Sequence, residues 1–200
     1  MKTNKYIQYI ILNFLFLIFT NSIYCQEWQA TDIGYYGHNI DFLNANTGFI
    51  GVTIIEDNHE KYKILKTTNK GISFSPIWTS TYNDWNVKGV GFDMISEQTG
   101  YVYTEGILYR TTNGGNNWVQ RFQIAYEESF YPIIKFANEN LGFISYTRYP
   151  FVALDTAKQK IYKITNGGNS WTIPFSSSTA NNWTPIIKDI SISDTNIIMV

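Results

Sequence analysis

The stretch that decides the fold is Thr111-Thr112-Asn113-Gly114-Gly115-Asn116-Asn117-Trp118. An asparagine side chain can bond to the backbone two residues further on, and glycine adopts positive φ without steric cost, so this cluster indicates a tight turn. Strand-forming residues precede it and an aromatic residue follows, which is typical of a β-hairpin. We expect the burial of this aromatic to hold the hairpin together more strongly than the turn's hydrogen bonds do.

The same motif occurs twice more, and Asn113 lies 44 residues after Asn69 and 53 residues before Asn166. The other copies are Thr67-Thr68-Asn69-Lys70-Gly71-Ile72-Ser73-Phe74 and Ile164-Thr165-Asn166-Gly167-Gly168-Asn169-Ser170-Trp171. A second shared element precedes each copy, as Asn46-Thr47-Gly48-Phe49, Gln98-Thr99-Gly100-Tyr101 and Asn140-Leu141-Gly142-Phe143. Repeats of this length, each with four short strands, are typical of propeller blades.

The sequence therefore predicts an all-β fold, a β-propeller of four-stranded blades with Asp-box-like turns. The blades cover about 38–79, 87–124 and 132–175, a fourth begins at 185–200, and Trp28–Ile33 reads as a lone strand. Without 25 amino-terminal residues, 175 of the 200 remain, which is about three and a half blades and fewer than the usual four. We expect an incomplete propeller, either a piece of a longer protein or a partial ring. A β-sandwich of short strands is the alternative.

The three motifs resemble the Asp-box, or BNR repeat, Ser/Thr-x-Asp-x-Gly-x-x-Trp, of sialidases, sortilin and some glycoside hydrolases. They are most similar to the version with two glycines in photosystem II stability/assembly factor-like proteins, where the box follows a Thr-Gly-aromatic hairpin. The resemblance spans roughly Asp41 to Trp171. It implies a structural role for the box residues, which are Thr67, Asn69, Gly71, Phe74, Thr111, Asn113, Gly115, Trp118, Asn166, Gly168 and Trp171.

The motifs depart from this pattern in ways that we expect to preserve the turn. Asparagine stands where aspartate is usual, Ile164 replaces the first Ser/Thr, and Phe74 replaces one tryptophan. These changes weaken the match to any one subfamily.

The amino terminus has the order of a secretory signal peptide, which we assign to residues 1–25. Lys2 and Lys5 precede an apolar run from Tyr9 to Phe19, about half the roughly 20 residues that a membrane-spanning helix needs. Cys25 could instead accept a lipid, but Tyr24 stands where a lipobox has a small residue. We expect a secreted, cell-surface or periplasmic protein, from a bacterium, with residues 26–200 as its mature part and no transmembrane segment after signal cleavage.

The composition excludes several classes of protein. The 15 basic and 16 acidic residues give a net charge of -1, which provides no basic footprint for a nucleic acid. One cysteine and two histidines exclude a disulfide framework and the usual zinc sites. We therefore expect no metal, no cofactor and no nucleic-acid partner.

Binding residues are expected in the loops that differ between the units, because loops on a rigid scaffold usually carry the function. Aromatic side chains there could stack on a sugar or a peptide beside acidic neighbours, or could simply close the seams between blades. The candidates are Tyr82, Asp84, Trp85, Glu105, Tyr126, Tyr131, Tyr149 and Trp183.

These patterns favour a non-enzymatic module for binding or scaffolding an unknown protein or glycan. The alternative is a secreted glycoside hydrolase of an Asp-box family whose catalytic acids lie partly outside this sequence, and a purely structural surface repeat is a third hypothesis. Glycosidases need two carboxylates at a set separation, which no sequence spacing establishes, so we assign no catalytic residue. A sialidase is disfavoured because two of the three arginines, Arg110 and Arg121, fall on outer strands.

Overall fold

The computed structural model describes residues 36–80, 90–104, 106–123, 132–148, 157–179, 187, 189–193 and 196–199. All of them belong to one compact unit, Ile33–Val200, and the second unit, Met1–Asp32, lies outside the described residues. The signal peptide at residues 1–25, Cys25 and the lone strand at Trp28–Ile33 therefore also lie outside them.

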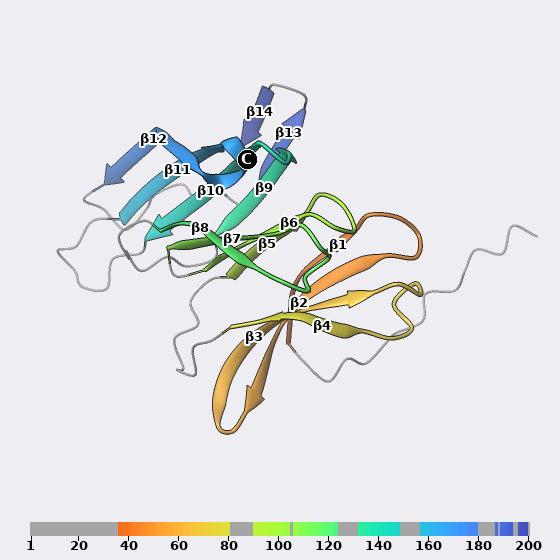
Figure 1. The fold of residues 1–200 in the computed structure, drawn as a ribbon. Coiled ribbons are helices and arrows are strands. Elements are labelled where there is room, and N and C mark those ends of the chain that lie inside the picture. Colours follow the sequence, from red (N-terminus) through yellow and green to blue (C-terminus); the bar gives the residue numbers. More distant parts are fainter. Residues whose placement is uncertain are drawn as a thin grey trace, which may run out of the picture. The chain divides into compact units, whose positions relative to one another are not determined.

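Three antiparallel sheets of four strands follow one another along the chain, and each keeps its strands in sequence order (Figure 1). We call them blades 1, 2 and 3. Blade 1 consists of β1 (Tyr36–Phe42), β2 (Gly48–Glu56), β3 (His59–Thr67) and β4 (Ser75–Thr79). Blade 2 consists of β5 (Val90–Met94), β6 (Gly100–Thr104), β7 (Ile107–Thr111) and β8 (Val119–Gln123). Blade 3 consists of β9 (Ile133–Asn138), β10 (Leu141–Arg148), β11 (Ala157–Thr165) and β12 (Ser170–Thr179), with a short 3-10 helix, η1 (Asn166–Gly168), before β12.

A two-stranded sheet follows blade 3. It pairs β13 (Ile190–Ser193) with β14 (Asn196–Met199), and β13 packs beside β9. Ile190 is buried against Phe143 and Ile161 of blade 3. The prediction of an all-β fold, an incomplete β-propeller of four-stranded blades, is confirmed, and the β-sandwich alternative is wrong.

The blades are structural repeats down to the register of their first two strands. Phe42 pairs with Gly48 in blade 1, Met94 with Gly100 in blade 2, and Phe136 with Gly142 in blade 3. In each case the apolar side chain lies over the glycine, where a Cβ would collide with it. This close packing explains why the glycine of the Thr-Gly-aromatic element recurs.

The two turns of each blade lie at the same end of the sheet, and in blades 1 and 2 a hydrogen bond joins them (Figure 1). The Lys70 amide donates to the carbonyl of Asn46 at 3.0 Å, and the Gly114 amide donates to that of Gln98 at 2.8 Å. In these two blades the box turn is thus bonded to the first turn of its own blade, and the pair of turns closes one end of the sheet.

The apolar core lies between successive blades, because alternate residues of a strand point to opposite faces of its sheet. One cluster joins Phe49, Tyr62 and Ile64 of blade 1 to Phe92 and Met94 of blade 2, with Val102 beside them. The next joins blade 2 to blade 3, and there Tyr101 and Phe136 stack with ring centroids 3.6 Å apart. The two clusters with the most buried residues therefore each join two successive blades.

Two expectations need correction. Trp171 is 40% exposed and Trp118 is only partly buried, so the box aromatics do not dominate the core. The largest fully buried side chains are instead tyrosines and phenylalanines of the second strands, among them Tyr101, Tyr146 and Phe143. These second strands lie inside the sheets, and that of blade 2 contributes Val102 to the cluster shared with blade 1 and Tyr101 to the cluster shared with blade 3.

The hairpin of blade 3 is longer than expected. We expected the third blade to end at about residue 175, but β12 continues to Thr179, which pairs with Ala157 at the start of β11. Threonine favours strands, and the backbone pairing continues through the serines that precede it.

Candidate functional site

A hollow of about 430 Å³ opens where the first strands of the three blades come together. It is lined by residues of β1, β5 and β9, with further contributions from β2, β3 and the segment before β13. The polar residues among them are His38, Asn39, Asp41, Thr53, Lys135 and Asp189, and Val90 and Ile133 are among the apolar ones. Hollows of this size with a few convergent polar groups are the usual form of ligand sites.

An ion pair between two blades supports one wall of this hollow. Lys135 Nζ lies 2.9 Å from Asp93 Oδ1, and the backbone N–H of Phe136 donates to Asp93 Oδ2 at 2.6 Å. The side chain of Asp93 is only 4% exposed whereas that of Lys135 is 45% exposed, so the ammonium group still reaches solvent in the hollow. The Asp93 carboxylate of blade 2 therefore anchors the Lys135 ammonium of blade 3 beside the hollow.

Burial and neighbouring charges shift the titration of this pair. Burial raises the pKa of Asp93 above its ordinary value, although the Lys135 ammonium opposes that effect. Burial acts to lower the pKa of Lys135, but the carboxylates of Asp93, Asp41 and Asp189 outweigh it and leave that pKa raised. The amine is therefore charged throughout the neutral range.

A second set of hydrogen bonds shapes the blade 1 side of the hollow. His38 Nε2 lies 2.6 Å from Thr53 Oγ1, and its ring stacks on Tyr62 with centroids 5.4 Å apart. The Tyr62 hydroxyl donates to Asn39 Oδ1 at 2.8 Å. Burial raises the pKa of Tyr62 far above its usual range, so this hydroxyl remains a donor. His38 and Asn39 are themselves exposed residues.

The turns with the predicted box residues have the same hydrogen bonds in blades 1 and 2. The Thr111 hydroxyl donates to Asn113 Oδ1 at 3.1 Å and accepts from the amide of Gly115 at 2.9 Å. Asn113 Oδ1 also accepts from the backbone amide of Asn117 at 2.9 Å. In blade 1 the equivalent bonds of Thr67 and Asn69 measure 2.9, 2.9 and 3.0 Å.

The turn of blade 3 is built differently. Ile164 has no hydroxyl to bind the turn amides, and Asn166 of η1 lies in the left-handed region at φ 54°. The backbone amide of Asn169 donates to the Asn166 carbonyl at 3.2 Å, as the equivalent amides of blades 1 and 2 also do. Gly168 and Trp171 remain in place, and Trp171 stacks on Phe122 of blade 2 with centroids 6.0 Å apart. The turn thus survives the loss of its threonine, but its bonding changes.

The predicted ligand loops lie outside the described residues. This holds for every candidate side chain there, which are Tyr82, Asp84, Trp85, Glu105, Tyr126, Tyr131, Tyr149 and Trp183. Their proposed role stays a prediction.

Sequence reasoning missed the hollow because its residues lie on strands rather than loops. The signal was nevertheless in the repeat, since Asp41, Asp93 and Lys135 hold the same register position, opposite Phe49, Tyr101 and Phe143. A charged residue recurring inside a first strand, with opposite signs in blades 2 and 3, indicates a polar contact between those strands.

Within the described ranges, no three His, Cys, Asp or Glu side chains come together in a way that could hold a metal ion. In the same part of the chain, no helix is long and apolar enough to cross a bilayer.

The fold and the hollow between first strands define the class of the protein, which is a β-propeller of four-stranded blades. No protein-family model matches the chain, and no curated protein matches its sequence. Among solved structures, the fold is similar to that of an enzyme described as Niastella koreensis GH74, with a TM-score of 0.56 and 18% identity over 82% of this chain. A structure described as YCF48 bound to D1 peptide matches with a TM-score of 0.49 and 16% identity over 83% of this chain.

The chain spans only part of each of these proteins, 26% of the GH74 chain and 46% of the YCF48 chain. At these identities the likeness concerns the fold alone.

Proposed function

We propose that this chain is a binding module whose ligand, a protein segment or a glycan, enters the hollow between the first strands. The observation that carries the proposal is that three successive blades contribute side chains to one hollow of about 430 Å³. A single blade offers only a row of side chains, whereas three blades surround a ligand and fix its orientation.

The chemistry of the lining suits a ligand with both hydroxyl or amide groups and a small apolar surface. Lys135, Asp41 and Asp189 provide charged hydrogen-bonding groups, and Asn39 provides an amide. Ile133 and Val90 provide apolar walls. Sugar rings and extended peptides both present such alternating polar and apolar surfaces.

A screen of glycan and peptide arrays with the full chain tests this proposal. Any hit is then measured by calorimetry against Asp41→Asn and His38→Ala, with Gln123→Ala on the outer strand β8 as the matched control. We expect at least a tenfold weaker affinity for the two hollow variants and unchanged affinity for the control. Equal affinity in all of them would place the ligand elsewhere.

Glycoside hydrolysis is the second candidate, because two carboxylates, Asp41 and Asp189, line the same hollow. Glycosidases use such a pair as acid and base or as acid and nucleophile. Chromatography of oligosaccharides incubated with the chain tests it, and turnover that disappears in both Asp41→Asn and Asp189→Asn would replace the binding proposal by this one.

We also propose export, on the basis of the charged and then apolar order of residues 1–25. Expression of the full gene in a bacterial host, followed by mass determination of the exported protein, tests this step. A mature chain that begins at Gln26 supports cleavage, whereas an acylated Cys25 would show the lipoprotein route instead.

A further inference from the structure

The first strand of blade 1 exposes side chains that its repeat partners bury. Phe42, Met94 and Phe136 occupy the same register position, each over the glycine of the facing strand. Met94 is 1% exposed and Phe136 is 6% exposed, because each packs against the preceding blade, but Phe42 is 45% exposed.

The position two residues earlier shows the same difference. Phe92 and Ile134 are 5% and 4% exposed, whereas Ile40 is 63% exposed. We call the side of a blade that faces the preceding blade its leading face and the opposite side its trailing face. The exposure on the leading face of blade 1 is confined to β1, because the neighbouring cluster of Val52, Ile54 and Leu65 within blade 1 is 0%, 7% and 6% exposed.

The hydrogen bonds that join blades explain what is different about blade 1. A glutamate in the first turn of each later blade accepts from a threonine of the preceding blade: Thr47 donates to Glu97 at 3.1 Å, and Thr99 donates to Glu139 at 3.5 Å. Blade 1 has Ala45 at this position. Its first turn therefore cannot accept the corresponding bond.

The aromatic of the box turn differs in the same sense. The indole N–H of Trp118 in blade 2 donates to the carbonyl of Ile77 in blade 1 at 2.9 Å. Phe74, the equivalent residue of blade 1, has no N–H to donate. Two of the groups by which a blade binds its predecessor are thus missing from blade 1.

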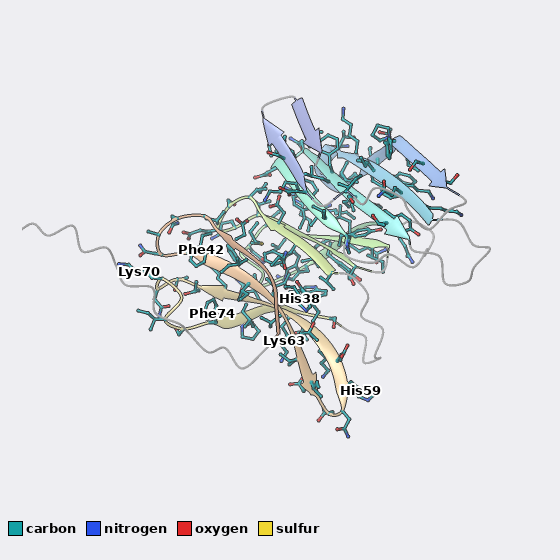
Figure 2. All side chains as sticks on the ribbon, turned by 180° about the vertical axis from the view of Figure 1, so that it is seen from behind. His38, Phe42, His59, Lys63, Lys70 and Phe74 are labelled. Atoms are coloured by element: carbon teal, nitrogen blue, oxygen red, sulfur yellow. The ribbon has the colours of Figure 1, made fainter. Side chains whose placement is uncertain are left out.

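The third difference changes the charge. A Cβ at Gly114 would lie 3.8 Å from the ammonium of Lys66, and one at Gly167 would lie 2.6 Å from the guanidinium of Arg110, so this position points at a cation of the preceding blade. Blade 1 has Lys70 there, exposed and at φ 65°, in a conformation that glycine adopts without strain. Figure 2 shows Lys70 and Phe42 toward the end of blade 1 that carries its turns.

Lys70 therefore places a cation at the position where blades 2 and 3 have a glycine beside a cation of the preceding blade. A preceding sheet with Lys or Arg at the position of Lys66 and Arg110 would meet Lys70 with like charge and without a compensating glutamate. Blade 3 carries Lys163 at that position. This repulsion disfavours head-to-tail association of two copies through blades 3 and 1.

From these differences we infer that the leading face of blade 1 is a docking surface for the trailing face of a further four-stranded blade, supplied from outside residues 36–200, that carries a carboxylate opposite Lys70. The apolar contact is made by Ile40 and Phe42, and the carboxylate pairs with the Lys70 ammonium. The contact at the leading face of blade 1 therefore differs from those between blades 1 and 2 and between blades 2 and 3, because here the later blade carries the cation and the preceding one the carboxylate.

The first test asks whether the surface is open in the full chain. Thiol labelling with a maleimide is measured for Phe42→Cys and for Met94→Cys, each in a Cys25→Ser background, with exposed Gln123→Cys as the reference. We expect Phe42→Cys to react within a few-fold of the reference and Met94→Cys at least 100-fold more slowly. Equally slow labelling of both would show that the surface is already covered, and slowing that grows with protein concentration would make a second copy the occupant.

The second test supplies a blade. A duplicate of residues 36–89 is inserted before residue 36 of the full chain, so that segment 81–89 links it to blade 1 as it links blade 1 to blade 2. With Lys66→Glu in the duplicate, we expect labelling at Phe42→Cys of the original blade to slow at least tenfold. With Lys66 retained, we expect it to remain fast.

A charge exchange completes the design. The duplicate with its native Lys66 is paired with Lys70→Glu in the original blade, and labelling should slow again because opposite charges now meet. Equal slowing in all three proteins would overturn the charge requirement. Fast labelling in all three proteins, with the added β-sheet signal visible by circular dichroism, would overturn the docking surface itself. A duplicate that adds no such signal would also count against it, because docking should stabilise the added blade.

Discussion

The indole nitrogen of Trp118 in blade 2 lies 2.9 Å from the backbone carbonyl oxygen of Ile77 in blade 1. The bond joins the turn of one blade to the outer strand of its neighbour, 41 residues earlier in the chain. Trp118 therefore acts at the seam between blades as much as within its own hairpin.

Trp118→Phe should lower the free energy of unfolding by about 1 kcal/mol, since it removes this hydrogen bond while keeping most of the ring. Chemical denaturation of the full chain measures the change. Phe74→Trp is the matched control and should not raise stability, because blade 1 has no described neighbour whose carbonyl could accept the added N–H. If Phe74→Trp raised the free energy of unfolding by as much as Trp118→Phe lowered it, the role of the Trp118 N–H in joining two blades would be contradicted.

Phe136→Ala should cost about 3–5 kcal/mol, because a buried ring that stacks on Tyr101 is replaced by a cavity. Phe42→Ala should cost less than half as much, since its ring already meets solvent. Thermal or urea unfolding of both variants compares the two equivalent positions directly. Similar costs would mean that Phe42 is covered in solution.

Thr111→Val should destabilise the chain by about 2 kcal/mol, because the amide of Gly115 and the side chain of Asn113 both lose the hydroxyl as a partner. The reverse change in blade 3, Ile164→Thr, exchanges buried apolar volume for the possibility of the same bonds. We expect it to be destabilising by about 1 kcal/mol, since Ile164 is fully buried and the smaller threonine would leave a cavity. Stabilisation by Ile164→Thr would show that the threonine-centred turn is the better one even in blade 3.

Lys70→Gly should stabilise the chain by about 1 kcal/mol, because Lys70 has a left-handed φ of 65° that costs a non-glycine residue free energy. Gly167→Ala should destabilise it, both through its φ of 64° and because the new methyl group would lie 2.6 Å from Arg110 Nη1. Differential scanning calorimetry of the two variants distinguishes backbone strain from the contact with Arg110. Equal and opposite shifts in Tm would indicate that strain alone is responsible.

Asp93 should make stability depend on pH in the acidic range. Its pKa in the folded chain is raised above the ordinary 3.8, mainly by burial, so the folded state holds the proton more tightly than the unfolded state does. Its contribution to stability is therefore greatest below 3.8 and falls as the pH rises through the raised pKa. Unfolding measured across this window should show a flatter profile in Asp93→Asn than in the native chain.

The raised pKa of Lys135 acts at the other end of the scale. Its contribution to stability is fully present below the ordinary 10.5 and is lost as the pH rises through the raised value. Lys163→Gln, which removes an exposed lysine of β11, is the control for general charge and should leave this alkaline decline unchanged. A profile that is identical in Asp93→Asn and the native chain would mean that burial does not perturb Asp93.

The sequence by itself determined the class of fold. Asparagine and glycine encode turns locally, and three copies of the same pair of turns, at Thr67, Thr111 and Ile164, require sheets of similar length in a fixed order. It also showed departures from the repeat, such as Phe74 where the other two copies have tryptophan.

Only the tertiary structure decided what those departures mean and where a ligand could enter. The exposure of Phe42 and the pairing of Asp93 with Lys135 depend on residues 40 or more positions apart meeting across a seam, and no local pattern fixes that distance. Hydrogen bonds within a turn join neighbours in the chain, whereas burial and ion pairing depend on which blade lies on each face. That is why the turns could be predicted while the hollow, and the open face of blade 1, could not.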